Sequence, residues 1–136
     1  MTSSPCSGRS ILIYLDTHVV VWLYAGLTEQ FSDAIQELVN DHDLLISPIV
    51  RLELQYLYDI KRVSVEPQPL LTDLSQRIGL SVCPKPFDAI IVHATRVPWT
   101  RDPFDRILVA HASLDGSILI SKDHTILNHY PQARWS

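Results

Sequence analysis

The sequence predicts one α/β domain in which a mostly parallel sheet is flanked by helices. Its 136 residues are the length of a single compact domain. Short apolar segments, such as 11–15 and 118–120, have the composition of strands that are buried on both faces of a sheet. Segments with helical periodicity separate these strands, and such alternation is typical of a parallel sheet covered by helices.

Composition narrows the class of protein further. With 46% hydrophobic and 19% charged residues, the chain can form a core, which excludes a disordered protein. No apolar run approaches the roughly 18 residues needed to span a membrane, and no signal peptide is recognisable, so we expect a cytoplasmic protein. Cys6 and Cys83 support neither a disulfide framework nor a cysteine metal site. The net charge of −4 argues against binding nucleic acid through bulk electrostatics.

The first half of the chain begins with a segment rich in Ser, Gly and Pro at 1–10, which we expect to be a disordered leader before a single domain at 11–136. The elements expected next are strand 11–15, helices 18–25 and 32–40, strand 44–46, and a helix from 48 to about 61. Gly26 is suited to close the first helix. Ser47 and Pro48 supply the N-cap and first position of the long helix.

The second half continues the alternation of helices and strands after a Pro-rich connection at 65–69. The elements expected are helix 70–78, strand 80–82, helices 87–96 and 103–116, strand 118–120, and a short helix followed by an edge strand near 134–135. Gly79 and Pro98 mark helix ends, and Asp102 before Pro103 marks a helix start.

Several common active-site motifs are absent from the sequence. There is no Gly-rich loop of the dinucleotide-binding or P-loop type, so these nucleotide-binding classes are excluded. There is no GxSxG element for a serine hydrolase and no HExxH or HxH spacing for zinc. The remaining side chains that could support chemistry are mainly carboxylates.

Two aspartates follow predicted strands directly. Asp16 follows strand 11–15 and Asp123 follows strand 118–120, and the carboxyl ends of parallel strands meet at one edge of a sheet, where ligands bind. Each aspartate also has a structural interpretation, because Asp16 can cap the next helix. Asp102 is suited to be an N-cap, and Asp105 could complete a reciprocal capping box with it.

Glu53 is a further candidate, because it lies among apolar residues in the second turn of its helix, although a solvated helix face would also explain it. Taken together, three or four converging carboxylates form an oxygen-rich ligand set for Mg²⁺ or Mn²⁺. Without metal they would repel one another and partly protonate. A metal held there would activate a bound water molecule by lowering its pKa.

Four segments carry a resemblance to a known family. They are Leu15-Asp16-Thr17-His18 with Trp22, Ser47-Pro48 through Glu53-Leu54, Arg101-Asp102-Pro103-Phe104-Asp105-Arg106 followed by Ala110-His111-Ala112, and Ser121-Lys122-Asp123. In this order they resemble the signature blocks of PIN-domain ribonucleases, and most of all VapC-type toxins of type II toxin-antitoxin systems. The resemblance spans about residues 11–135 and implies the three-layer sandwich of that family.

The resemblance also implies an activity, a site and partners. It places the family's acidic quartet, as metal ligands and catalytic groups, on Asp16, Glu53, Asp105 and Asp123. Ser121 falls at a position that supports the metal site, and Asp102 is explained as the cap that aims Asp105. The implied protein is a metal-dependent endoribonuclease with Mg²⁺, for which Mn²⁺ can substitute. It is the toxin of a toxin-antitoxin pair, binds a cognate antitoxin, and forms a homodimer.

Cations near the acidic segments are candidates for binding RNA. They are Arg101, Arg106 and Lys122, the last at a position where the family often has a smaller residue. Arg51 has two equal interpretations, as an RNA contact or as a solvated side chain. Apolar and aromatic residues in two helices are either core or a groove in which an antitoxin would place a cationic side chain near the carboxylates; they are Trp22, Tyr24, Tyr56, Leu57 and Tyr58.

Two other classes of protein compete with this interpretation. A receiver-like phosphoryl-transfer domain also gathers aspartates and a lysine around Mg²⁺, but there is no second acid beside Asp16 and no aspartate directly after the second or third predicted strand. A non-catalytic metal-binding or interaction module could share the same fold. The complete quartet favours the nuclease.

Overall fold

The computed structural model describes residues 11–136, so the expected leader at 1–10 lies outside the described residues. Five strands in this part form one sheet in the order β3-β2-β1-β4-β5, and every neighbouring pair is parallel. The strands are β1 (Leu12–Leu15), β2 (Asp43–Ile46), β3 (Ser81–Val82), β4 (Ile118–Ile120) and β5 (Ala133–Arg134). The predicted α/β class with a mostly parallel sheet is therefore confirmed.

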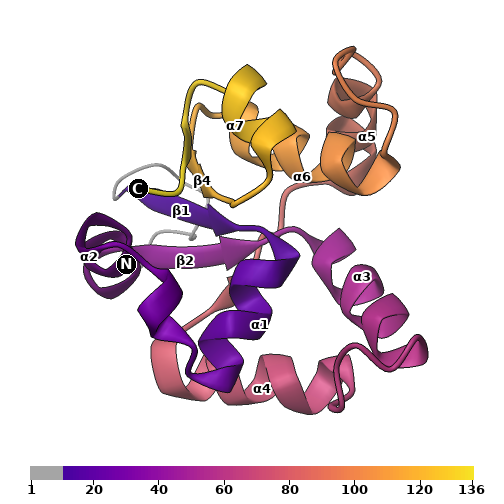
Figure 1. Cartoon of the computed structure of the whole chain (residues 1–136). Helices are drawn as coiled ribbons and strands as arrows, with labels where there is room; N and C mark the ends of the chain where they lie inside the picture. The colour runs from indigo at the N-terminus through magenta and orange to yellow at the C-terminus, as the bar shows by residue number, and fades with distance from the viewer. Residues whose placement is uncertain (1–10) are drawn as a thin grey trace, which may run out of the picture.

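Helices connect successive strands across both faces of the sheet (Figure 1). They are α1 (Thr17–Ala25), the 3₁₀ helix η1 (Thr28–Gln30), α2 (Asp33–Asp41), α3 (Pro48–Asp59), α4 (Pro67–Ile78), α5 (Phe87–Ala94), α6 (Pro103–Ser113) and α7 (His124–His129). Because parallel crossovers are right-handed, the change of direction across the sheet places α1 to α4 on one face and α5 to α7 on the other. Contacts among α1, α3 and α4, and between α5 and α6, agree with this division, although α3 also contacts α6 of the other layer.

The core is formed by strands that are buried on both faces, as their composition predicts. All four residues of β1 are buried, as are Leu44, Leu45 and Ile46 in β2 and Leu119 and Ile120 in β4. Wholly apolar strands cannot expose either face without loss of hydrophobic stabilisation, so helices must cover both. Within residues 11–136, no helix has both the length and the apolar character needed to cross a bilayer.

Polar side chains cap the helices that begin at the carboxyl edge of the sheet. Asp16, Ser47 and Asp123 cap α1, α3 and α7, because each side chain accepts a hydrogen bond from a backbone N–H in the first helical turn. Asp102 caps α6 in the same way. These caps bring three of the acidic residues singled out in the sequence to helix starts.

Helix α4 begins at Pro67, not at residue 70 as predicted. The Pro-rich stretch suggests a connection, but the first N–H groups of a helix have no intrahelical acceptor, so prolines in the first turn sacrifice no hydrogen bond. The end of α3 also differs, because it stops at Asp59, and Lys61 then adopts a left-handed conformation with φ of 64°.

Helices α5 and α6 are shorter than predicted as well. Helix α5 ends at Ala94, and helix α6 ends at Ser113, where a turn through Gly116 with φ of 68° leads into β4. Only glycine adopts this backbone conformation without a steric penalty, so Gly116 belongs to the turn and not to the helix.

Candidate active site

Asp16 lies at the junction of β1 and α1. Its backbone N–H donates to the carbonyl of Ile120 at 3.0 Å, which continues the pairing of β1 with β4. Its carboxylate accepts from the backbone of Thr17 and from the Ser121 hydroxyl, each at 2.6 Å. Burial raises the pKa of Asp16, although the hydrogen bond from Ser121, the charge of His18 and the Thr17 N–H all act to lower it. This carboxylate is therefore held firmly at the edge of the sheet.

Ser121 links Asp16 to Asp123. Its buried hydroxyl donates to Asp16 and accepts from the backbone N–H of Asp123 at 3.1 Å. The Asp123 carboxylate in turn accepts from the Ile126 N–H at 3.0 Å at the start of α7. One hydroxyl thus fixes the relative position of two residues of the predicted quartet, although they are 107 positions apart in the sequence.

Glu53 approaches the same edge from the second turn of α3. The buried Thr17 hydroxyl donates to its Oε1 at 2.6 Å, so Glu53 faces α1 and is not the fully solvated side chain that was its alternative interpretation. Burial raises the pKa of Glu53 against the opposing effect of the Thr17 hydrogen bond, and the negative charge of Asp16 raises it further.

Asp105 lies in the first turn of α6, next to the capping residue Asp102. The Asp102 carboxylate accepts from the N–H of Phe104 at 2.9 Å and that of Asp105 at 3.4 Å. The interpretation of Asp105 as the other half of a capping box is wrong, because the N–H of Asp102 donates to the Thr100 hydroxyl at 3.2 Å. Asp105 therefore has no capping role that would explain it.

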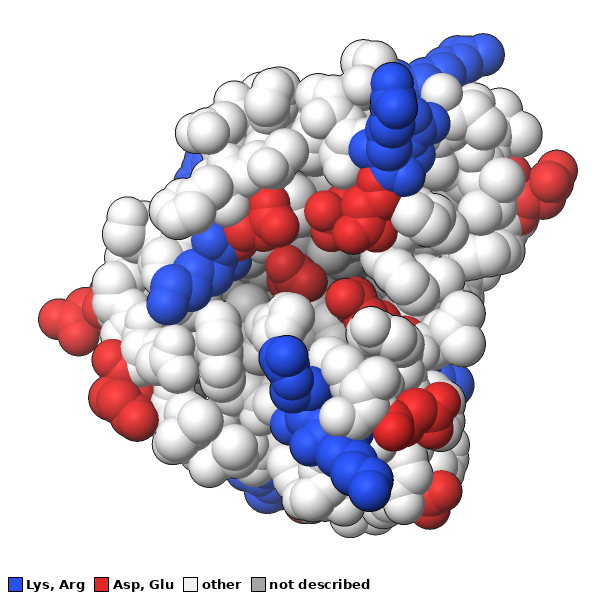
Figure 2. Space-filling view, turned by 45° about the vertical axis from the view of Figure 1, so that its right-hand side comes forward, with Lys and Arg blue, Asp and Glu red and all other residues white. Residues whose placement is uncertain are grey.

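These carboxylates lie close enough to act on one another through their charges. Figure 2 shows a hollowed face of the molecule where acidic side chains gather with basic side chains around them. Asp105 is the carboxylate on which four others act. Burial, followed by the charges of Asp102, Asp123, Asp16 and Glu53, raises the pKa of Asp105 to about 7. We call these five residues the acidic cluster. It contains all four members of the predicted quartet.

The donor chemistry of the acidic cluster suits a hard divalent cation, because every candidate ligand is an oxygen atom. A cation would also relieve the repulsion that raises these pKa values. Within residues 11–136, no three His, Cys, Asp or Glu side chains are already arranged as a metal-binding group. The fit to Mg²⁺ or Mn²⁺ thus rests on the donor set and its charge.

The three predicted RNA-binding cations have different surroundings. Arg101 is exposed, whereas Arg106 uses its Nε to donate to the Thr100 carbonyl at 2.8 Å and so holds the loop before α6. Lys122 is exposed, and its ammonium lies 5.7 Å from the centre of the Trp22 ring. Arg101 and Lys122 are therefore available to a substrate, and Arg106 has at least one structural contact.

The structure shows the surroundings of Arg51 and of two of the apolar candidates, each of which had two interpretations. Arg51 donates to Gln68 of α4 at 2.9 Å, so its guanidinium contacts protein. Of the apolar candidates, Leu57 belongs to the core with 8% exposure, whereas Tyr56 is 55% exposed. The core interpretation holds for Leu57, and Tyr56 lies on the surface of α3.

Sequence reasoning did not assign roles to Thr17 and His18. Thr17 bridges Asp16 and Glu53, because its N–H binds one carboxylate and its hydroxyl the other. His18 acts on the same two carboxylates through its charge. Their position directly after Asp16 was the available signal, but their contacts depend on how α3 packs against α1.

The fold and the site together define the class of protein. It is an α/β domain with a parallel sheet and a cluster of carboxylates where the strands end. The PIN domain family model matches residues 13–131, and the chain belongs to that family. No curated protein sequence matches it significantly.

Solved structures with the same fold include toxin-antitoxin complexes. VapBC2 from Rickettsia felis, bound to a DNA fragment from its promoter, has 17% identity and a TM-score of 0.62, covering 93% of this chain and 100% of that one. A toxin-antitoxin complex from Klebsiella pneumoniae has 20% identity and a TM-score of 0.64, with 90% and 95% covered. VapBC-1 from nontypeable Haemophilus influenzae has 17% identity and a TM-score of 0.60, with 93% and 97% covered. At these identities the likeness is one of fold.

Proposed function

We propose that this protein is a metal-dependent endoribonuclease that acts as the toxin of a toxin-antitoxin pair. The observation that supports the nuclease most strongly is the convergence of Asp16, Glu53, Asp105 and Asp123. Burial, followed by the charges of Asp102 and of the other three carboxylates, raises the pKa of Asp105 to about 7. Such a concentration of negative charge opposes folding unless a cation binds. Its location at the carboxyl edge of a parallel sheet is the usual location of a site in such folds.

The proposed metal is Mg²⁺ or Mn²⁺, held by the four carboxylates of the quartet. When bound, such a cation activates water and stabilises negative charge on the phosphodiester under attack. Asp16 and Glu53 are kept in place by Ser121 and Thr17, whose hydroxyls donate to them. These hydroxyls orient the carboxylates toward a ligand, as groups that hydrogen-bond to metal ligands do in other proteins.

The remaining residues position the acidic groups and the substrate. Asp102 fixes the first turn of α6 and hence the backbone of Asp105. Arg101 and Lys122, exposed near this turn and the β4 edge, supply positive charge for the RNA backbone. Because the protein as a whole carries a net charge of −4, attraction must come from such local cations and the bound metal.

The proposed partner is a small antitoxin that covers apolar surface on α3. Leu52 and Tyr56 are 57% and 55% exposed and lie one helical turn apart. A groove beside them is lined by residues of α3 and the start of α4, namely Pro48, Arg51, Leu52, Gln55, Glu66, Pro67 and Gln68. Since α3 also carries Glu53, a segment bound there could place a cationic side chain against the acidic cluster. The solved neighbours include toxins with their antitoxins, which supports this partner.

Two further expectations belong to the proposal. We expect a homodimer, as the family resemblance implies, and light scattering of the purified protein measures this. We expect action in the cytoplasm, where RNA substrates are present. In cells, producing this chain alone should arrest bacterial growth, and producing a small protein encoded beside its gene should relieve the arrest. Normal growth with soluble, active protein would contradict the toxin role but not the nuclease.

The direct test is cleavage of RNA by the purified protein. End-labelled RNA and single-stranded DNA of the same sequence are incubated with Mg²⁺ or with chelator. We expect defined RNA fragments only with metal, and none from Asp105→Asn. Binding of RNA without cleavage under all metal conditions would instead favour a non-catalytic module.

A further inference from the structure

Four side chains form a continuous strip beside the acidic cluster, and we call them the aromatic strip: His18 and Trp22 of α1, Lys122 after β4, and Trp135 after β5. The rings of His18 and Trp22 have centroids 6.2 Å apart, and those of Trp22 and Trp135 are 5.5 Å apart. The Lys122 ammonium lies 5.7 Å from the Trp22 centroid and 6.0 Å from that of Trp135. These four residues come from three separate segments of the chain.

A buried phenylalanine and a backbone hydrogen bond fix the position of the strip. Phe31, which is 5% exposed, meets the Trp135 ring edge-on with centroids 5.6 Å apart. The backbone before Lys122 is fixed, because the N–H of Ser121 donates to the Arg134 carbonyl at 3.1 Å. His18 and Lys122 are exposed, and Trp22 and Trp135 are half-buried. The strip thus presents side chains to solvent whose positions are already set.

Lys122 is notable because it follows Ser121 and precedes Asp123, yet it forms no ion pair with a carboxylate of residues 11–136. Attraction to the two indole rings accounts for this position, since a cation within about 6 Å of an aromatic ring centroid is stabilised by the ring's negative face. The lysine charge therefore remains available to an anion from outside, and the carboxylates remain available to a cation.

The strip also starts at the acidic cluster. His18 lies two residues after Asp16 in the first turn of α1, and Lys122 directly precedes Asp123. From there, the rings of Trp22 and Trp135 lead away over α1 and the end of β5. A polymer whose phosphate lies at the acidic cluster would have its neighbouring units over these rings.

We propose that the aromatic strip binds a single-stranded RNA segment next to the scissile phosphate, with Lys122 contacting a backbone phosphate and the ring surfaces contacting unpaired bases. This inference rests on the proposed nuclease function and specifies its substrate class. Aromatic rings combined with cations are the usual means of binding single strands, because every base has a face that can stack. Bases in a duplex are already stacked on one another, so the strip selects against paired RNA.

The test measures binding separately from cleavage. Full-length Asp105→Asn protein, with Mg²⁺ present, is titrated into a fluorescein-labelled RNA of mixed sequence, about 12 nucleotides long, and into the same strand in a duplex. Lys122→Gln, Lys122→Arg and Trp22→Leu are each added to this background. Lys61→Gln is the matched control, because Lys61 has the same charge and lies past the end of α3, eight residues beyond Glu53.

We expect the single strand to bind at least about fivefold more tightly than the duplex, and Trp22→Leu to weaken its binding at least about fivefold, the lower end for loss of a stacked base. Lys122→Gln should weaken binding and reduce the slope of log K against log salt by about 0.7, the value for one phosphate contact on a single strand. Lys122→Arg should restore most of the affinity, and Lys61→Gln should have no effect.

Equal binding of duplex and single strand, no detectable binding by the parent protein, or an unchanged salt slope in Lys122→Gln would overturn the inference. A strip variant that binds RNA normally but escapes inhibition by an antitoxin would also overturn it, because the strip would then contact a protein. If wild-type protein cuts no RNA with metal while the binding results hold, the nuclease proposal fails and the single-strand site stands.

Discussion

Replacing Asp105 with Asn is expected to stabilise the metal-free protein above neutral pH, although it removes a proposed metal ligand. Burial and four neighbouring carboxylates raise the pKa of Asp105 to about 7, from an ordinary value of 3.8. The folded protein therefore binds this proton more tightly than the unfolded chain does. By linkage, stability falls as pH rises from about 4 to about 7 and stays low above that range.

The size of the effect follows from the shift in pKa. One pKa unit corresponds to about 1.4 kcal/mol, so the whole shift corresponds to about 4 kcal/mol. Since Asp105 is only partly buried and shares the repulsion with its neighbours, we expect Asp105→Asn to raise the free energy of unfolding by about 2–4 kcal/mol at about pH 8. At about pH 4 the gain should be under about 1 kcal/mol, because Asp105 is then protonated in the folded protein.

Urea unfolding in chelator, followed by circular dichroism at both pH values, measures this difference. Asp41→Asn is the matched control, because Asp41 is exposed at the end of α2, and its change should be within about 0.5 kcal/mol. A hundredfold excess of Mg²⁺ over its dissociation constant should stabilise the wild type by about 2.7 kcal/mol and leave Asp105→Asn unchanged. The reasoning is refuted if Asp105→Asn is no more stable than wild type at about pH 8, or if its advantage is the same at both pH values.

Two further predictions test the surroundings of the site, and a third tests a buried histidine of α6. Ser121→Ala should lower the free energy of unfolding by about 1–3 kcal/mol and reduce cleavage, because Asp16 and the N–H of Asp123 lose the hydroxyl that they share. A variant with wild-type stability and activity would contradict this. Asp123→Asn should abolish cleavage and leave the free energy of unfolding nearly unchanged. Asp123→Ala should also lower the free energy of unfolding by about 1 kcal/mol, because the cap of α7 is lost. Equal melting temperatures of the two variants would argue against this role of the cap. His111→Leu should reduce acid sensitivity. Burial, and then the charge of Lys85, lowers the pKa of His111 to about 4, so wild-type stability is lost as pH falls from about 6.5 to about 4; a variant with the same pH dependence as wild type would disprove this origin.

The sequence predicted much of the fold because its signals were local. Wholly apolar strands with aspartates after them placed Asp16 and Asp123 at one sheet edge, and N-cap residues marked the starts of α3 and α6. The start of α4 was missed because prolines indicate either a connection or a first helical turn, and the sequence alone does not distinguish the two.

Long-range contacts were the part that local signals did not contain. The hydroxyl of Thr17 meets Glu53 only because α3 packs against α1, and Lys122 meets Trp22 only because β4 pairs with β1. Asp105 illustrates the same limit. Its spacing from Asp102 fits a capping box, but Thr100 occupies that role in the folded protein.

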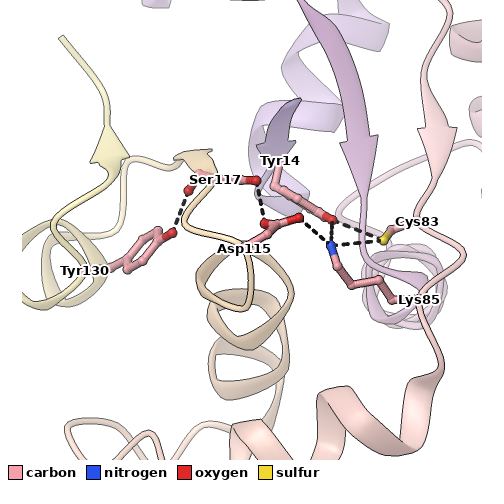
Figure 3. Close-up of polar contacts among 6 residues, drawn as sticks. All are labelled: Tyr14, Cys83, Lys85, Asp115, Ser117 and Tyr130. Atoms are coloured by element: carbon pink, nitrogen blue, oxygen red, sulfur yellow. Dashed lines mark hydrogen bonds and ion pairs between the residues drawn. The ribbon is translucent and has the colours of Figure 1, made fainter. Parts of the chain in front are cut away.

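The measurement that tests the central claim most directly is mapping of end-labelled RNA after incubation with purified protein and Mg²⁺. Asp16→Asn, Glu53→Gln, Asp105→Asn and Asp123→Asn are compared with Asp115→Asn. The Asp115 carboxylate pairs with Lys85 at 2.8 Å outside the acidic cluster (Figure 3). We predict defined cuts by wild type and Asp115→Asn that disappear with chelator, and no cuts by any of the four cluster variants. Cleavage that persists in chelator, or in two or more of the cluster variants, would contradict the assignment of a metal-dependent nuclease site to these carboxylates.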